Sequence, residues 1–404
     1  MNRLFKYILL LASVVCNFSC EKEIDLNEYT VTKIYYRTSD DKPITQSSSW
    51  NREFDSQILA DSYSADNGGC LLVYGKVTTF DAWFHFCSTL TEINIPSGIK
   101  YISEGAVSFC SRLTSVTIPN SVTTIGRLAF KSCYGLTSVT IGDSATTIGE
   151  YAFGDCDSLT EFNGKFASED GRCLIVDGTL NSFAPAGLVS YTIPDSVTTI
   201  GRSAFRDCDS LTSVTIPDSV TTIEGSAFNY CESLTSVTIP DSVTTIGEKA
   251  FYRCSNLTNV TIGDSVTTIG DYAFKYCSSL TSVTIPDSVM TIGEDAFYYC
   301  DSLTSVTIPD SVTTIVRGAF QYCDSLTSVT IGDSVTTIGS WAFFNCASLT
   351  RVYCTAAVPP SLGSDVFYSN GSGRKIYVPS QSIKAYKSAD GWKEYANSII
   401  GYDF

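Results

Sequence analysis

The stretch "LTSVTIPDSVTTIGEKAFYRC", from Leu234 to Cys254, recurs with few changes along most of the 404-residue chain. Its cysteine marks the period of the repeat. Cysteines stand 23 residues apart in two runs, at Cys87, Cys110, Cys133 and Cys156, and at Cys208, Cys231, Cys254, Cys277, Cys300, Cys323 and Cys346. The 52-residue gap between the runs equals one unit of 23 residues and one of 29, so one repeat is lengthened and none is missing.

Each repeat has the pattern of a strand, a turn and a short helix. In "LTNVTI" (257–262), Val260 and Ile262 alternate with Thr261, which is the period of a strand. In "GDYAFKYC" (270–277), Ala273, Phe274 and Cys277 share one face of a short helix. The "PDSVTTIG" that separates the two in most repeats consists largely of turn-forming residues.

This pattern predicts a repeat solenoid. A period of 20 to 29 residues with an L-x-x-L-x-L core is typical of leucine-rich repeats. We therefore expect a right-handed solenoid with a parallel β-sheet and a short helical turn in each 23-residue coil. No repeat can cover its own apolar face, so neighbouring repeats must share one continuous core.

The repeated phrase L-T-S-V-T-I-P-x-S-V-T-x-I-G-x-x-A-F-x-x-C is similar to that of the BspA-like leucine-rich-repeat surface proteins, over roughly residues 71 to 352. The flanking "IYYRTSDDKPI" (34–44) and "KIYVPSQSIKAYKSADGWKEYA" (375–396) resemble the same family. The resemblance implies an exported bacterial protein at the cell surface. Some members of the family are adhesins for host matrix proteins or for other bacteria, and others have no known role.

The predicted domain organisation follows from these segments. An amphipathic stretch, Ser382 to Ile400, is expected to close the apolar end of the array. We predict a signal peptide (1–19), an N-terminal tether and cap (20–66), a first repeat block (67–158), a lengthened irregular repeat (159–187), a second repeat block (188–352) and a C-terminal cap (353–404).

The first twenty residues, "MNRLFKYILLLASVVCNFSC", have a basic start and a short apolar stretch, as in a secretory signal. The small Ser19 before Cys20 resembles the end of a bacterial lipoprotein signal, which predicts lipidation of Cys20 and an outer-membrane lipoprotein facing the cell exterior. Ordinary cleavage with release of the chain is the alternative. The formal net charge of −16 argues against a nucleic-acid partner, because phosphate binding needs a basic surface.

The cysteines are predicted to be reduced, buried and structural. They share the inward face of the expected helix, and the two runs contain an odd number of cysteines, which cannot all pair. A disulfide framework is the alternative in an exported chain. No metal site is expected, because no repeat contains a C-x-x-C motif or a neighbouring histidine.

No catalytic residue and no cofactor is predicted. "GDS" at Gly142, Gly263 and Gly332 resembles an esterase nucleophile motif, but each copy stands where other repeats read "PDS". The only histidine, His85, lies in the atypical first repeat, so these serines have no base nearby. We interpret "GDS" as a variant of the turn.

Repeated aspartates from Asp195 to Asp333 should stack about 5 Å apart, where like charges repel by about 0.8 kcal/mol in water. Backbone N–H groups of the turns are expected to stabilise them. A row of cations is the alternative. The triplet Asp-Ser-Val also resembles an O-glycosylation acceptor of some anaerobic Gram-negative bacteria.

The positions that vary between repeats lie beside "AF" and are rich in aromatic residues. Binding hot spots favour Trp, Tyr and Arg, whereas the strand face offers only Ser and Thr. We name these positions the aromatic ridge and predict that they bind a ligand: Tyr230, Tyr252, Arg253, Tyr272, Tyr276, Tyr298, Tyr299, Tyr322, Trp341 and Phe344. The alternative is that they only shield the edge of the helices.

Together these features predict a non-catalytic protein of the cell surface that presents an extended surface for adhesion. The expected partners are host or bacterial surface proteins. Two alternatives remain open at this stage: capture of glycans by stacking on the tyrosines, and a spacer that holds other components away from the membrane.

Overall fold

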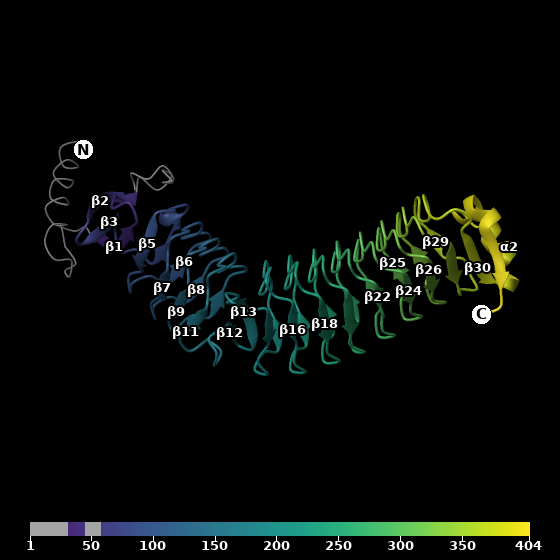
Figure 1. The fold of residues 1–404 in the computed structure, drawn as a ribbon, viewed down its shortest axis with the longest axis horizontal. Helices are drawn as coiled ribbons and strands as arrows, with labels where there is room; N and C mark the ends of the chain where they lie inside the picture. The colour runs from purple at the N-terminus through teal and green to yellow at the C-terminus, as the bar shows by residue number, and fades with distance from the viewer. Residues whose placement is uncertain (1–30, 45–57) are drawn as a thin grey trace. The chain divides into compact units, whose positions relative to one another are not determined.

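The computed structural model describes residues 31–44 and 58–404, so the predicted signal peptide and Cys20 lie outside the described residues. By its internal contacts the chain divides into two units, residues 1–177 with 181–186, and residues 178–180 with 187–404. Within each unit the repeats stack as coils of a parallel solenoid (Figure 1).

The first unit begins with an antiparallel sheet in the order β2-β3-β1-β5. Its strands are β1 (Val31–Thr38), β2 (Ile58–Ser64), β3 (Gly68–Tyr74) and β5 (Leu90–Asn94). Tyr36 of β1 is buried, and its ring contacts Phe84 at 5.7 Å between centroids. The sheet therefore covers the apolar end of the first coil. Strand β3 falls inside the predicted first repeat block but pairs with the strands of this sheet.

The coils of the first unit carry two parallel ladders of strands. One contains β4 (Thr79–Phe80), β6 (Tyr101–Ile102), β8 (Thr124–Ile125) and β10 (Thr147–Ile148), and the other contains β7 (Ser115–Ile118), β9 (Ser138–Ile141) and β11 (Glu161–Asn163). A short 3₁₀ helix, η3 (Ala82–Phe84), replaces part of the first coil. The lengthened repeat contains β12 (Cys173–Val176) and β13 (Thr179–Phe183).

The second unit also carries parallel ladders of strands on two sides of its coils. The ladder of short strands runs from Thr179 and Leu180 of β13 through β15 (Thr199–Ile200), β17 (Thr222–Ile223), β19 (Thr245–Ile246), β21 (Thr268–Ile269), β23 (Thr291–Ile292), β25 (Thr314–Ile315) and β27 (Thr337–Ile338) to β29 (Ser361–Leu362). The other side carries two five-stranded sheets. The first contains β14 (Ser190–Thr192), β16 (Ser213–Thr215), β18 (Ser236–Ile239), β20 (Asn259–Ile262) and β22 (Ser282–Val283). The second contains β24 (Ser305–Ile308), β26 (Ser328–Ile331), β28 (Arg351–Cys354), β30 (Lys375–Pro379) and β31 (Ile399–Tyr402).

Like residues pair with like in these ladders. Thr245 lies beside Thr268 and Ile246 beside Ile269, each 23 residues further along. The core repeats with the same period, because in one coil Leu234, Val237, Ile239, Val243, Ile246, Ala250, Phe251 and Cys254 are all at most 3% exposed. Rings from Phe205 to Phe367 form an internal stack, with centroids 4.9 to 5.7 Å apart and planes within 13°.

The arc after each short strand consists of consecutive hydrogen-bonded turns and not of a regular helix. The N–H groups of Ala273 and Lys275 donate to carbonyls three residues earlier, in their own coil. Those of Tyr272, Phe274 and Tyr276 donate to the next coil, each over 2.8 Å. Every N–H of an α-helix points along the same axis, so this alternation requires a different backbone. The arcs thus form a third ladder between coils.

The C-terminal cap contains η4 (Ser380–Ser382), α2 (Ile383–Ser388) and η5 (Trp392–Ser398). The fully buried rings of Tyr386 and Trp392 contact each other at 4.8 Å, and the Trp392 indole donates to the Pro360 carbonyl. The stretch expected to close the array therefore does cover its last coils. Strand β31, which pairs with β30, is an additional element that the sequence pattern does not predict.

The cysteine thiols connect neighbouring coils. The Sγ atom of Cys254 donates to the Phe228 carbonyl at 3.2 Å, and that of Cys277 donates to the Phe251 carbonyl at the same distance. All fourteen described cysteines are buried and none forms a disulfide, as the sequence predicts. Burial raises the pKa of the Cys277 thiol. Cysteine suits the position because it is a small apolar residue that also donates a weak hydrogen bond.

Thiol labelling tests this role. Because the thiolate is the reactive form, N-ethylmaleimide should modify the described cysteines of the folded protein at least about 100-fold more slowly than those of the denatured protein, as mass spectrometry can measure. A disulfide between coils in a non-reduced digest, or equally rapid labelling of both forms, would contradict it.

Candidate binding surface

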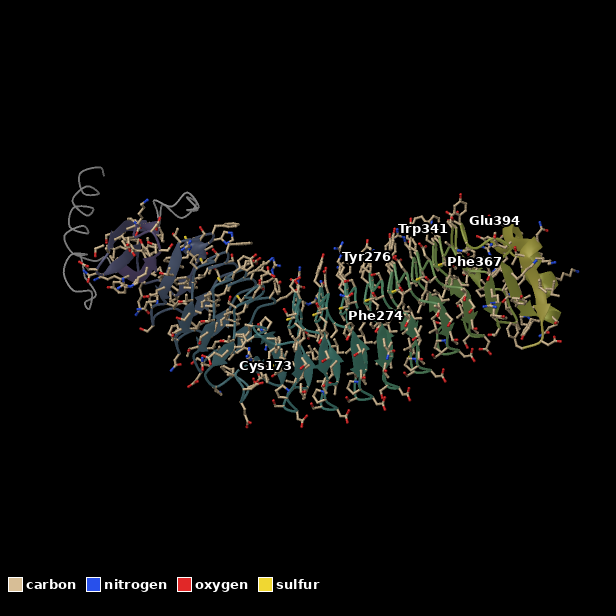
Figure 2. All side chains as sticks on the ribbon, viewed as in Figure 1. Cys173, Phe274, Tyr276, Trp341, Phe367 and Glu394 are labelled. Atoms are coloured by element: carbon tan, nitrogen blue, oxygen red, sulfur yellow. The ribbon has the colours of Figure 1, made fainter. Side chains whose placement is uncertain are left out.

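The structure brings eight of the ten residues of the aromatic ridge into one continuous set of contacts along the arcs of the second unit. Figure 2 shows Tyr276 at the outer margin of the arcs and Phe274 inside the coils. All members are half-buried except Arg253, which is exposed. Tyr272 and Trp341 lie three or four residues earlier in their arcs and make separate contacts with cations.

Five members of the ridge form a stacked column, which we define as Tyr230, Arg253, Tyr276, Tyr299 and Tyr322. The rings of Tyr276 and Tyr299 stack at 5.5 Å, and those of Tyr299 and Tyr322 at 4.6 Å. Arg253 takes the place of a ring, with its guanidinium carbon 5.4 Å from the Tyr230 centroid and 5.2 Å from that of Tyr276.

Three further aromatic residues, Tyr252, Tyr298 and Phe344, flank the column one residue earlier in alternate coils. Tyr252 contacts Tyr230 at 5.7 Å and Tyr276 at 5.6 Å. Tyr298 contacts Tyr276 at 5.6 Å and Tyr322 at 5.4 Å. These are tilted or edge-to-face contacts, which stabilise aromatic pairs as offset stacking does. Together with the column, these three flanking rings form one continuous strip of eight residues, which we call the aromatic strip.

Most ring faces of the ridge are already covered. Tyr299 lies between Tyr276 and Tyr322 in the column. The Lys275 ammonium lies 3.9 Å from the centroid of Tyr298, and Arg317 lies 4.7 Å from that of Trp341. Burial raises the pKa of the Tyr298 hydroxyl to about 12. The strip thus offers mainly ring edges and hydroxyl groups to a ligand.

Seven of the ten ridge residues have a left-handed backbone, with φ between 56° and 64°: Tyr230, Arg253, Tyr272, Tyr276, Tyr299, Tyr322 and Trp341. Such angles are uncommon for bulky residues and cost about 1 to 2 kcal/mol each. The arc requires them at two positions in each coil, because its N–H groups alternate in direction. Equivalent positions in earlier coils carry small polar residues, such as Ser203 and Asp207, as well as bulky ones, such as Phe109 and Leu128.

Sequence reasoning missed several members of this surface. Tyr368 is 60% exposed and stacks on Phe344 at 5.6 Å. The pair Val366–Phe367 before it follows Ala342–Phe343 by 24 residues and is the signal that could have revealed it. Lys275 was also missed. Its ammonium pairs with the buried Asp295 carboxylate at 2.7 Å, a contact that the sequence pattern does not indicate.

The profile of the BspA-type leucine-rich-repeat region matches residues 78–168, 179–303 and 290–389 of the chain. The chain belongs to the BspA-type leucine-rich-repeat family. A comparison with curated proteins finds no match. The resemblance seen in the sequence is thus confirmed for this BspA-type protein.

Several solved bacterial proteins are similar to it. A leucine-rich repeat protein from Bacteroides ovatus shares 28% identity over 76% of this chain and 88% of that chain, with a TM-score of 0.46. One from Eubacterium ventriosum shares 25% identity over 63% and 82%, with a TM-score of 0.49. A leucine-rich cell surface protein from Faecalibacterium prausnitzii shares 24% identity over 96% and 99%, with a TM-score of 0.42.

The "GDS" turns of this BspA-type protein have a steric explanation. A Cβ atom on Gly263 would lie 2.4 Å from the Pro240 carbonyl oxygen of the previous coil. This close approach lets the Asp264 N–H donate to the Asp241 carboxylate at 2.9 Å, and Asp333 donates to Asp310 in the same way at 2.8 Å. Backbone donors of the following coil therefore stabilise Asp241 and Asp310, two members of the row of repeated aspartates.

The histidine does not complete a catalytic pair with a "GDS" serine. In the first unit His85 Nδ1 lies 2.5 Å from the Ser108 hydroxyl and 3.1 Å from the Gly105 carbonyl. Ser108 is 1% exposed, so its hydroxyl is not available to a substrate in this conformation. A hollow of about 200 Å³ lies beside this pair.

The strand face carries a second, wider hollow of about 640 Å³ in the second unit. It is lined by small hydroxyl residues such as Ser236 and Thr238 and bordered by Asp218, Asp241 and Asp264. It contains no large side chain that could serve as an anchor, as expected from the repeats. Among residues 31–44 and 58–404, no group of His, Cys, Asp and Glu could hold a metal ion, and no helix is long and apolar enough to cross a membrane.

Two ion pairs of equal length test the packing of the ridge. Lys275→Met should lower the free energy of unfolding by about 3 kcal/mol, because it leaves the buried Asp295 carboxylate unpaired. Lys393→Met is the matched control, since Lys393 also lies 2.7 Å from its partner, Asp390, but both side chains are exposed. Urea denaturation should show no change for the control, and equal losses in the two variants would contradict the burial of the ridge pair.

Proposed function

We propose that this BspA-type protein is exported to the cell surface and that the aromatic ridge binds protein partners in adhesion. The continuous strip of Tyr and Arg carries the proposal, because these residue types are enriched in protein-binding hot spots. Membership of the family supports surface location and a role without catalysis.

The backbone of the ridge also supports binding. Gly or Asn would adopt the left-handed conformation at lower cost than Tyr or Trp. Small polar residues do occupy it at Ser203 and Asp207, so the arc can close without rings. Mutual stacking recovers part of the cost for Tyr276 and Tyr299, while Trp341 stacks only on a cation. A ligand that contacts the strip supplies a reason for the bulky residues.

The covered ring faces favour a protein over a sugar. A sugar ring stacks on an open aromatic face, where its C–H groups meet the negative π surface. In the column these faces lie against neighbouring rings or Arg253. Edges and hydroxyl groups can still donate to and accept from backbone and side-chain groups of a protein. The spacer alternative requires no binding and is an outcome of the experiment below.

A ridge variant tests binding. Tyr298→Ala combined with Tyr322→Asn, in which Asn tolerates the left-handed backbone, should weaken binding to immobilised matrix proteins by about 30-fold, as expected for loss of a hot spot. The control is Tyr101→Ala with Tyr134→Ala, which removes two exposed tyrosines outside the ridge.

Surface titration against purified matrix proteins and a glycan array would measure these affinities. Equal losses in the two variants would contradict a role of the ridge. Binding to glycans alone would support the sugar alternative, and binding to neither would support the spacer.

A second experiment concerns display. In a Gram-negative host, Cys20→Ala should move the protein from the membrane fraction to the soluble fraction and abolish labelling by radioactive palmitate, because the thiol is the lipid acceptor. Protease added to intact cells should remove a C-terminal tag from the unaltered protein. Survival of the tag while lysed cells lose it would contradict outward display.

A further inference from the structure

Five cations lie over aromatic rings along the arcs of the second unit, and a sixth, Arg374, lies over Phe367 and Tyr395 beside the C-terminal cap. The distances from the charged group to the ring centroid range from 3.9 Å, for Lys275 over Tyr298, to 5.9 Å. Such contacts hold a cation by its attraction to the negative face of the ring. The five residues are Arg206, Lys249, Arg253, Lys275 and Arg317.

Four of these five cations also pair with a carboxylate of the same unit. Arg206 lies 3.1 Å from Asp207, Lys249 lies 2.5 Å from Glu248, Lys275 lies 2.7 Å from Asp295, and Arg317 contacts Glu294. The recurring arrangement is thus a ring, a cation and a carboxylate. Arg253 is the exception among the five, because no ion pair of the described residues includes it. Arg374 also has no ion pair, but its guanidinium donates to the Phe367 carbonyl and the Asn370 side chain.

The geometry of Arg253 suits a charged ligand. Its guanidinium lies between the rings of Tyr230 and Tyr276 and is also 5.9 Å from that of Tyr252, yet the side chain is exposed. A side-chain hydrogen bond with Tyr252 raises the pKa of Arg253 and engages part of its guanidinium. The stacked rings cover only its two faces and leave its other N–H donors in the plane, where they can grip both oxygens of one carboxylate. Stacking also holds the side chain still before a ligand binds, which lowers the entropic cost of binding.

A hollow of about 170 Å³ adjoins Arg253, Tyr276 and Tyr299. The small Ser255 and Ser278 line it, at the positions that carry the larger Glu232 and Asp301 in the coils on either side. The hollow therefore gives room for one side chain of a partner beside the guanidinium. Without this hollow, a partner's carboxylate could reach the guanidinium only from its solvent-exposed edge.

We propose that Arg253 binds a carboxylate of the protein partner, from an Asp or Glu side chain that enters the hollow between Ser255 and Ser278. This proposal rests on the proposed function and names the chemistry of its contact. The partner's carboxylate completes at Arg253 the arrangement that Arg206, Lys249, Lys275 and Arg317 complete within the chain.

Two acidic residues of the hollow oppose this contact. Glu232 and Asp301 line it in the coils directly before Ser255 and directly after Ser278, about 5 Å further along at the usual strand spacing. Burial and the neighbouring Asp324 raise the pKa of Asp301. Glu232 lines the same hollow, so its neutralisation should strengthen the binding of an acidic ligand.

Fluorescence anisotropy with labelled octapeptides tests the proposal on the full chain. The acidic probe alternates Glu with Ser, and the matched probes replace Glu by Gln or by Lys. The acidic probe should bind at least about 10-fold more tightly than the Gln probe, and 0.5 M NaCl should reduce this difference, because the contact is an exposed ion pair.

Substitutions at Arg253 should reduce the preference for the acidic probe while the column remains stacked. Arg253→Tyr introduces the residue that neighbouring coils carry at this position, so the fold is retained and the acidic probe should bind about 10-fold more weakly. Arg253→Lys should lose part of the affinity, since an ammonium cannot make the paired contact. Lys249→Gln is the control, because it removes one positive charge from the same coil. The Lys249 ammonium already pairs with Glu248, so the affinity for the acidic probe should change less than about 2-fold.

Variants that neutralise the two acidic residues of the hollow show whether its ligand is an anion or a cation. Glu232→Gln and Asp301→Asn should each strengthen binding of the acidic probe. If they instead abolish binding of the Lys probe, the hollow takes a cation and the proposal is wrong. Equal binding of a uronic-acid oligosaccharide, also lost in Arg253→Tyr, would assign the carboxylate to a glycan and overturn the protein partner.

The matrix-protein titration separates this proposal from the proposed function. Arg253→Tyr should weaken the binding of matrix protein by about 10-fold as well. If it binds as tightly as the unaltered protein while the Tyr298 and Tyr322 variant does not, the ridge binds proteins without Arg253. Thermal unfolding followed by circular dichroism checks that each variant is folded.

Discussion

The hydrogen bonds between neighbouring arcs set the geometry of each unit. In an ordinary helix all N–H groups serve the helix itself, but here every second one, such as those of Tyr272, Phe274 and Tyr276, serves the next coil. This alternation is possible only if two residues in each arc adopt a left-handed backbone. The coils are thereby held at the spacing of a sheet on the arc side as well as on the strand side.

That spacing has direct consequences for the side chains. Inside the second unit it stacks the phenylalanines from Phe205 to Phe367 with nearly parallel planes. It also brings each cysteine thiol within reach of a carbonyl in the previous coil. Outside, it stacks Tyr276, Tyr299 and Tyr322 and admits the guanidinium of Arg253 as an equivalent member of the column. Core and surface thus follow the same period.

The architecture could be predicted from the sequence because the repeat is nearly exact. Leu234, Val237 and Ile239 indicate the buried side of a strand, and the constant interval between cysteines indicates stacking in register. The bonding of the arc could not be predicted, since Ala273, Phe274 and Cys277 fit one face of a helix equally well. A left-handed Tyr276 is also contrary to intrinsic preference, which points to Gly or Asn, and only the stacking of coils imposes it. The candidate surface was located by its variation between repeats, but the pairing of cations with carboxylates depends on side-chain positions that no linear pattern contains.

The identity of successive rungs has an evolutionary meaning. Because Thr245 pairs with Thr268 and Ile246 with Ile269, gain or loss of one whole 23-residue segment by unequal recombination would leave every remaining pairing intact. The number of repeats can therefore change by one at a time without any new arrangement of the core. An event between Arg253 and Tyr322 would lengthen or shorten the tyrosine column by one ring and would change how many coils separate Arg253 from the C-terminal cap. A gene of this kind can vary the length of its aromatic ridge by copy number, while the interior that supports the ridge stays the same.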